Sequence, residues 1–410
     1  MATPNDPSAR PIAIALAGLL ALAIAMGIGR FAFTPLLPMM LHDGVIDLPG
    51  AGWLASANYL GYWLGAIGCA LQPALSRRWG LAPLPHTAAV RVGLVATVLL
   101  TVGMALPWPS AWPWWRGLAG VASALVFVYV SGWCLARLSA SGAPSLAGII
   151  YVGPGLGIAL SGFAATAMVA HGMRAATGWA LFAVLALVLT ALAWPHLKGD
   201  VMVAAHLPAE LDTPPRSTIV AFTLAYGMAG FGYIITATFL PVIARQVLPG
   251  SIWLDLFWPI FGIGVATGAL LTVRLPMHWD RRRLLMACYA MQATGVLLSV
   301  WWPTLAGFAL GSLLLGLPFT AITLFAMQEA RRLAPHNASS LIGLLTAAYG
   351  LGQIAGPPLV ARLVQLRSTP SEGFNASLQA AALSLLLGLA IFALLERRER
   401  LGALPGRRPA

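Results

Sequence analysis

Long apolar runs alternate with short polar stretches along the whole chain. A membrane-spanning helix needs about 20 mostly apolar residues. Runs of that length occur at 12–39, 51–72, 86–106, 112–135, 145–170, 176–195, 218–243, 252–273, 284–302, 305–328, 340–361 and 375–395. A transmembrane β-barrel would show alternating apolar and polar residues instead. The pattern therefore predicts an all-α integral membrane protein with twelve transmembrane helices.

The composition agrees with a membrane protein. The chain is 59% hydrophobic and 9% charged, with a mean hydropathy of +0.83, whereas soluble domains carry about 25% charged residues. The first run is longer than the apolar part of a signal peptide and no cleavage site follows it, so we expect it to be retained. The three cysteines, Cys69, Cys134 and Cys288, fall within apolar runs. They indicate neither a disulfide framework nor a metal cluster, and no cofactor is expected.

The connections between the runs differ in positive charge. The two termini and the connections after even-numbered runs hold 17 of the 24 Lys and Arg residues, while the opposite connections hold four, namely Arg174, Arg245, Arg362 and Arg367. The positive-inside rule then places both termini in the cytoplasm, as an even number of spans requires. We therefore expect a multi-pass protein of the cell inner membrane. Its net charge of +12 matches the anionic cytoplasmic leaflet and requires no nucleic-acid partner.

The chain contains an internal repeat. A shift of 203 residues aligns glycines and prolines of the first two helices with those of the seventh and eighth: Gly27, Gly29, Pro38, Gly61 and Gly65 fall on Gly230, Gly232, Pro241, Gly264 and Gly268. A shift of 195 aligns the fifth helix with the eleventh, from Arg137 on Arg332 to Gly157 on Gly352. The repeat predicts six-helix bundles at 1–195 and 218–410, the second with a short cytoplasmic tail, joined by a cytoplasmic linker at 196–217. Such parallel repeats are typical of transporters.

Two loops at corresponding positions of the repeat resemble the gating loop of the major facilitator superfamily (MFS), Gly-x-x-x-Asp-Arg-x-Gly-Arg. After the second helix the matching residues are Arg78 and Gly80, and Arg77 stands where the family has Asp. After the eighth helix the copy keeps Asp280 and Arg281. The two halves are therefore unequal in this motif.

Three further segments carry the same resemblance. Arg116 and Gly120 match an Arg-x-x-x-Gly motif of the fourth helix, and Gly153-Pro154 resembles a motif associated with antiporters. The segment GIGRFAFTPLLPMM, Gly27 to Met40, resembles the first-helix signature of the YbfB/YjiJ-type branch. The resemblance implies an MFS fold of two pseudo-symmetric six-helix bundles, a central cavity lined by the first, fourth, seventh and tenth helices, and alternating-access transport without enzymatic activity.

Three arginines lie well inside apolar runs: Arg30, Arg91 and Arg116. A charge within the membrane is costly and marks a candidate functional site. The resemblance places Arg30 and Arg116 on the central cavity, and Arg91 near the cytoplasmic end of the third helix fits a structural role. Arginines without carboxylates favour an anionic substrate, because guanidinium groups bind carboxylate or phosphate through paired hydrogen bonds.

Polar and aromatic side chains on or beside the cavity helices are candidates to complete a substrate pocket, although each also fits a role in helix packing. They are Thr34, Asn58, Tyr59, Tyr62, Tyr129, Tyr226, Tyr233, Gln328, Tyr349 and Gln353.

Two hypotheses for the function stay open at this point. The favoured one is transport of a small organic anion or amphipathic metabolite, and the alternative is proton-coupled efflux of a drug or metabolite. The alternative needs a titrating carboxylate, for which the candidates are Asp255 and Glu329. The chain shows no nucleotide motif or sensor domain that would favour a pump, an enzyme or a receptor. We expect a monomer whose partners are its substrate, the lipid bilayer and, as a candidate coupling ion, the proton.

Overall fold

The computed structural model describes residues 11–80, 82, 84–199, 215–248, 253–276, 279–334 and 338–402. In these ranges the chain is helical and contains no strand. The helices of the first half are α1 (Pro11–Leu22), the π-helical segment η1 (Ala23–Arg30), α2 (Phe33–His42), α3 (Leu48–Arg78), α4 (His86–Ala105), α5 (Trp112–Ala140), η2 (Pro144–Val152), α6 (Gly153–Ala170), α7 (Ala175–Ala193) and η3 (Trp194–His196). Those of the second half are α8 (Arg216–Val247), η4 (Leu254–Leu256), α9 (Phe257–Arg274), α10 (Arg281–Trp301), α11 (Leu305–Gly316), α12 (Phe319–Leu333), α13 (Ala338–Leu366) and α14 (Pro370–Gly402).

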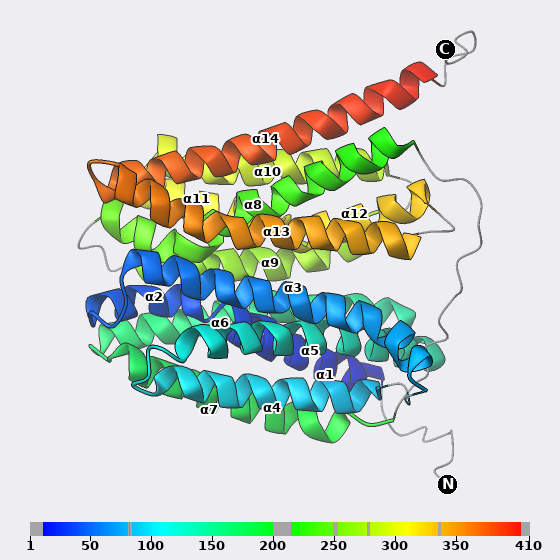
Figure 1. Cartoon of the computed structure of the whole chain (residues 1–410), viewed down its shortest axis with the longest axis horizontal. Coiled ribbons are helices and arrows are strands. Elements are labelled where there is room, and N and C mark those ends of the chain that lie inside the picture. The colour runs from blue at the N-terminus through cyan, green and yellow to red at the C-terminus, as the bar shows by residue number, and fades with distance from the viewer. Residues whose placement is uncertain are drawn as a thin grey trace.

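Each of the twelve predicted runs coincides with one helical rod in the described part of the chain, some rods being built from two or three consecutive segments. Ten rods are long and apolar enough to cross a membrane by length and composition. The other two, α3 and α13, have 31 and 29 residues and run alongside them (Figure 1). The prediction of an all-helical, multi-pass membrane fold is confirmed.

The rods form two groups that lie one above the other in Figure 1, α1–α7 below and α8–α14 above. The groups meet where α3 packs on α13, α6 on α9 and α2 on α8. The residue boundaries proposed for the two bundles stay a prediction, because most of the linker at 196–217 lies outside the described residues, as do the outermost residues of both tails.

Glycines allow the closest approaches between rods. A Cβ atom added to Gly61 of α3 would lie 1.8 Å from the carbonyl oxygen of Gly117 in α5, and one added to Gly268 of α9 would lie 1.8 Å from that of Leu317. Backbones in contact at such distances admit only glycine. Glycines that the internal repeat aligns therefore lie at close contacts between rods in both halves.

Polar residues set the ends of several rods. The Asp47 side chain accepts a hydrogen bond from the backbone N–H of Gly50 and caps α3, and the Asp280 side chain caps α10 in the same way. Gly80, just beyond α3, has a φ of 63°, a conformation that glycine adopts without strain. The start of α1 and the end of α14 lie at the same end of the bundle (Figure 1).

Candidate functional site

The first rod changes its winding in the middle of the bundle. Residues Ala23–Arg30 form a π-helix, and the N–H of Phe31 donates to the carbonyl of Met26 five residues earlier, 3.1 Å away. Pro35 has no N–H, so the carbonyl of Phe31 cannot receive the usual helical bond from it. The break leaves backbone carbonyls at Gly29 and Arg30 free to bond elsewhere. Irregular backbone at this depth must be satisfied by the protein itself.

Arg116 of α5 satisfies those carbonyls. Its two terminal nitrogens donate to the carbonyl oxygens of Gly29 at 3.2 Å and Arg30 at 3.0 Å. The Asn58 amide of α3 donates in turn to the carbonyl of Arg116 at 2.9 Å and to that of Gly29 at 3.5 Å. Arg116 is 2% exposed and Asn58 is fully buried. Arg116 and Asn58 therefore hold the break in the first rod and with it the position of Arg30.

Arg30 lies at the break and reaches into the second half of the chain. Its Nη2 donates to Oε1 of Gln353 in α13 at 2.6 Å, and the Gln353 amide nitrogen donates to the hydroxyl of Tyr233 in α8. The guanidinium carbon stands 3.9 Å from the centre of the Tyr62 ring and 5.4 Å from that of Tyr59, both within cation–π range. Arg30 is 3% exposed and its Nε has no hydrogen-bond partner.

The internal repeat explains why these residues meet. Arg30 and Tyr233 are separated by the repeat offset of 203 residues, and so are Thr34 and Ala237. The Thr34 hydroxyl donates to the carbonyl of Ala237 at 2.9 Å. Positions related by a two-fold axis between the halves can touch only beside that axis. Arg30 and its partners therefore lie near the axis between the two halves.

The buried arginines of this region are not paired with carboxylates. Among the described residues, neither Arg30 nor Arg116 takes part in an ion pair. The Nε of each and Nε1 of buried Trp258 are donors without an acceptor. Buried polar groups are normally satisfied, and exceptions mark sites that a ligand or water completes. Most of the unmet groups here are therefore donors that need acceptor atoms, while Oδ1 of Asn58 is an acceptor without a donor.

Aromatic rings surround the Arg30–Gln353 bond. Tyr226 stacks on Tyr349 with ring centroids 4.8 Å apart, and Tyr349 stacks on Tyr233 at 5.8 Å. Phe319 packs edge-on against Tyr233 at 5.1 Å and against Phe31 at 6.1 Å. The predictions had included the three tyrosines but missed both phenylalanines. The position of Phe31 directly after Arg30 is the signal that could have identified it.

Most predicted pocket residues therefore gather around Arg30, including Tyr59, whose hydroxyl lies 2.9 Å from that of Thr238. Tyr129 does not. It packs against His86 with ring centroids 5.2 Å apart and lines a separate cavity of about 280 Å³ with Cys69 and Gln72. The other predicted residue, Gln328, is half-buried and its Oε1 has no hydrogen-bond partner.

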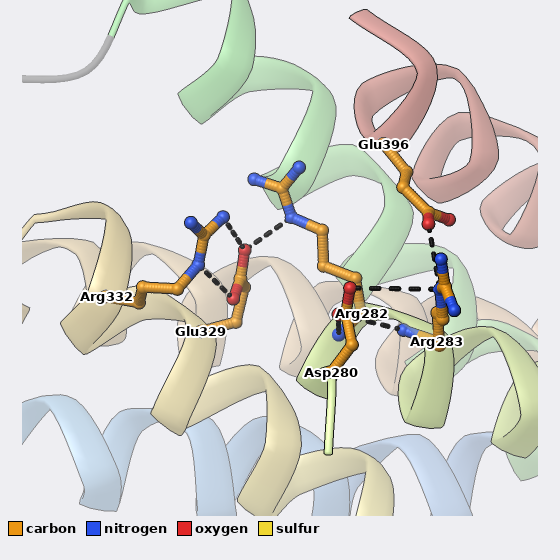
Figure 2. Close-up of polar contacts among 6 residues, drawn as sticks. All are labelled: Asp280, Arg282, Arg283, Glu329, Arg332 and Glu396. Carbon is orange, nitrogen blue, oxygen red and sulfur yellow. Dashed lines mark hydrogen bonds and ion pairs between the residues drawn. The ribbon is translucent and has the colours of Figure 1, made fainter. Parts of the chain in front are cut away.

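Both candidate carboxylates for proton coupling are paired with arginine. Asp255 lies in the short turn η4 and accepts a hydrogen bond from Arg245. Glu329 is 1% exposed within α12, although its sequence position suggested a helix end. It accepts from Nε of Arg282 and, at 2.8 Å, from two nitrogens of Arg332. Figure 2 shows both arginines beside this one carboxylate, Arg282 facing it with Nε and Arg332 with two nitrogens.

The two gating-loop copies differ in structure as they do in sequence. Arg77 and Arg78 end α3 and are exposed. In the second copy Asp280 caps α10, and Arg281 lies 5.8 Å from the centre of the Phe325 ring. Arg282 and Arg332 complete the network with Glu329, and the sequence predictions had missed them. Arg282 aligns with Trp79 in the repeat, so comparison of the halves offered no signal for it.

Comparison with known proteins agrees with this architecture. The fold closely matches a variant of the nucleoside transporter NupG, with a TM-score of 0.74 over 93% of this chain and 99% of that one, at 14% sequence identity. A D-xylose–proton symporter matches with a TM-score of 0.65 over 93% of this chain and 96% of that one, also at 14% identity. The chain shares the fold of these two transporters.

A family model described as "Uncharacterised MFS-type transporter YbfB" matches residues 22–393, and the chain belongs to this family. The cyanate transport protein CynX of Escherichia coli (strain K12) is 28% identical over 127 residues, which are 30% of this chain. That match spans about a third of the length of CynX, 32%. The protein is thus a multi-pass MFS-type transporter, as the first-helix signature had predicted.

Proposed function

We propose that this transporter moves a small organic anion by alternating access and that Arg30 binds the anion directly. The observation that carries the proposal is the state of Arg30. It is buried beside the axis between the halves, its acceptor is the neutral amide of Gln353, and its Nε has no partner. An anion would supply the acceptors and the charge that the site lacks, through charge-assisted hydrogen bonds.

In this proposal Arg116 acts mainly as a positioning residue. Both of its terminal nitrogens are engaged with the carbonyls of Gly29 and Arg30, so it supports the backbone from which Arg30 extends. Tyr59, Tyr62, Tyr233, Tyr349 and Gln353 form the wall of the anion site. The relative CynX is named for the transport of cyanate, which is an anion, and this name is consistent with the proposed substrate class.

Alternating access requires bonds between the halves that break and re-form. Side chains of α3 provide three, because Ser56 donates to the carbonyl of Ile354 at 2.9 Å, Trp63 donates to that of Ala347 at 3.0 Å, and the hydroxyls of Tyr59 and Thr238 share a hydrogen bond. The Arg30–Gln353 bond also joins the halves, and it alone of these includes the proposed anion-binding group. We propose that an anion takes the place of Gln353 on Arg30 and so loosens one contact between the halves.

Proton-coupled efflux stays the second candidate, on the strength of buried Glu329 and the Gly153-Pro154 motif. A proton-exchanging Glu329 would have to separate from Arg282 and Arg332 during turnover. The double variant Asp255→Asn, Glu329→Gln tests this candidate in proteoliposomes with an internal pH dye. Proton movement that is unchanged in the variant would exclude both carboxylates as coupling groups.

Uptake of labelled solutes into proteoliposomes tests the favoured function. The panel pairs carboxylates with amines of similar size, and protein-free liposomes serve as the blank. We expect saturable uptake of at least one carboxylate and none of its amine counterpart. Saturable uptake of amines alone would contradict the proposal.

A further inference from the structure

We propose that the anion is an aromatic carboxylate, with its carboxylate on Arg30 and its ring against the tyrosines beside it. The inference rests on the proposed function, since it names the class of anion for the same site. Arg30 accounts for the charge of the substrate. The arrangement of aromatic rings around Arg30 accounts for the aromatic ring of the substrate.

Five of the eight tyrosines in the chain stand around the Arg30–Gln353 bond: Tyr59, Tyr62, Tyr226, Tyr233 and Tyr349. They come from α3, α8 and α13, so both halves contribute. A core that only had to fill space in a membrane bundle would be built more simply from aliphatic residues, because phenol hydroxyls need partners at that depth. The concentration of phenols at one charged residue therefore indicates ring recognition.

The rings of Tyr226, Tyr349 and Tyr233 form a ladder of nearly parallel faces. Successive rings are inclined by 30° and 20°, with centroids 4.8 and 5.8 Å apart. Flat rings prefer offset-stacked partners at about 4.5–7 Å. Because Tyr226 and Tyr233 stack on Tyr349, a further aromatic ring would meet the edge of Tyr349 in an edge-to-face pair, whereas a saturated chain gains only contact area.

The ladder begins next to the positive charge. Gln353 bonds both to Arg30 and to Tyr233, the end ring of the ladder, and the Arg30 guanidinium faces the Tyr62 ring at 3.9 Å. Tyr62 and Tyr349 are half-buried and keep accessible surface, whereas Tyr226 and Tyr233 are buried. A molecule that carries its carboxylate directly on, or one carbon from, a ring matches this short spacing between the charge of Arg30 and the accessible tyrosine rings.

Matched probes separate the ring from the charge. The thermal stability of the purified full-length protein is measured with benzoate and phenylacetate, with cyclohexanecarboxylate and cyclohexylacetate as saturated counterparts, and with benzylamine. A ligand that binds the native state raises the apparent stability by an amount that grows with the logarithm of its affinity at a fixed concentration. We expect each aromatic acid to bind about 3- to 10-fold more tightly than its saturated counterpart, the range that one stacking contact supplies.

Variants of Tyr349 test the location. In Tyr349→Leu the preference for the aromatic acid should fall to about onefold. In Tyr349→Trp the preference should persist, and this second variant keeps the test valid if Tyr349→Leu does not fold. Tyr129→Leu, a change beside His86 and the separate cavity, should retain the wild-type preference.

The outcomes distinguish this inference from the proposed function. Equal affinity for aromatic and saturated acids overturns the aromatic inference and leaves an anion transporter. Stabilisation by benzylamine alone overturns both. Absence of stabilisation by benzoate and phenylacetate, with either saturated acid still binding, also overturns the inference.

Discussion

The guanidinium of Arg30 donates a hydrogen bond to the side-chain amide of Gln353 at 2.6 Å, and this bond joins residues 323 positions apart in the two halves of the chain. The acceptor is neutral, so Gln353 satisfies a geometric need of Arg30 without neutralising its charge. An anion offers both a hydrogen-bond acceptor and a negative charge that neutralises Arg30. The bond thereby relates the binding of an anion to the contact between the halves, and it is the first target for mutation.

Replacing Gln353 by a carboxylate should block the site. In Gln353→Glu the new side chain lies within reach of Arg30 and acts as a tethered competitor, whose effective concentration is in the millimolar range or above. We expect anion uptake into proteoliposomes to fall about tenfold or more, with a rise in melting temperature. The control is Ser56→Ala, which removes another hydrogen bond between the halves. An equal loss of uptake in this control would show that loss of any contact between the halves reduces transport, and would contradict a special role of Gln353.

Arg116→Lys should destabilise the break in the first rod. A lysine ammonium cannot reproduce the fixed geometry with which the guanidinium reaches the carbonyls of both Gly29 and Arg30. Loss of one such charge-assisted bond costs about 1.5–3 kcal/mol, which a thermal unfolding scan in detergent detects. Arg91→Lys, at an arginine that lies 4.9 Å from the centre of the Trp194 ring, is the control. Indistinguishable melting temperatures for wild type and Arg116→Lys would refute the positioning role.

Glu329→Gln should be among the most destabilising conservative changes in the second half. It removes the negative charge that the buried Arg282 guanidinium contacts at Glu329, and breaking a buried ion pair costs about 3–5 kcal/mol. The matched change Glu396→Gln affects a pair with Arg283, whose side chain is 60% exposed, and should cost about 0–1 kcal/mol. Chemical unfolding curves of the two variants give the comparison. Equal costs would mean that burial of the network of Glu329, Arg282 and Arg332 adds nothing to stability.

Two glycines of α3 provide a packing test. Gly61→Ala places a methyl group against the Gly117 carbonyl of α5, whereas an alanine at Gly68 meets no atom within 4 Å. We expect Gly61→Ala to lower stability by about 1–3 kcal/mol, as overpacking does, and Gly68→Ala to be near neutral. Melting temperatures of the purified variants report the difference. Similar values would show that α3 and α5 separate without cost.

The predicted orientation can be tested at two exposed connections. Ser141 follows α5 and His171 follows α6, so they lie at opposite ends of the bundle. If both termini are cytoplasmic, His171→Cys should react with a membrane-impermeant maleimide in intact cells and Ser141→Cys only after permeabilisation. The wild type, with its three native cysteines, gives the background. The reverse labelling pattern would invert the topology.

Much of the architecture could be predicted because its causes are local. Apolar length indicates a spanning helix, and the glycine spacing at Gly61 and Gly65 recurs in Gly264 and Gly268 because both halves pack in the same way. That Tyr129 lies away from the site could also have been predicted from the sequence. It follows Arg116 by 13 residues, which turns it by about 220° around α5 at 3.6 residues per turn, and the structure finds it away from the site.

Other features depend on tertiary contacts that no local pattern encodes. The π-helical turn before Arg30 exists where Arg116 and Asn58 can satisfy its carbonyls, and those side chains come from other rods. The burial of Glu329 depends on Arg282, which comes from a different rod of the same half. The partnership of Arg30 with Gln353 depends on the rotation of α13 about its own axis.

The most direct test of the central claim is anion uptake by Arg30→Ala beside Arg91→Ala in proteoliposomes, with the carboxylate that the wild type transports best. Both changes remove a partly or fully buried arginine from the first half, but only Arg30 lies beside the axis. We predict that Arg30→Ala abolishes saturable uptake while Arg91→Ala retains it. Wild-type uptake and affinity in Arg30→Ala would contradict the assignment of Arg30 as the anion-binding residue.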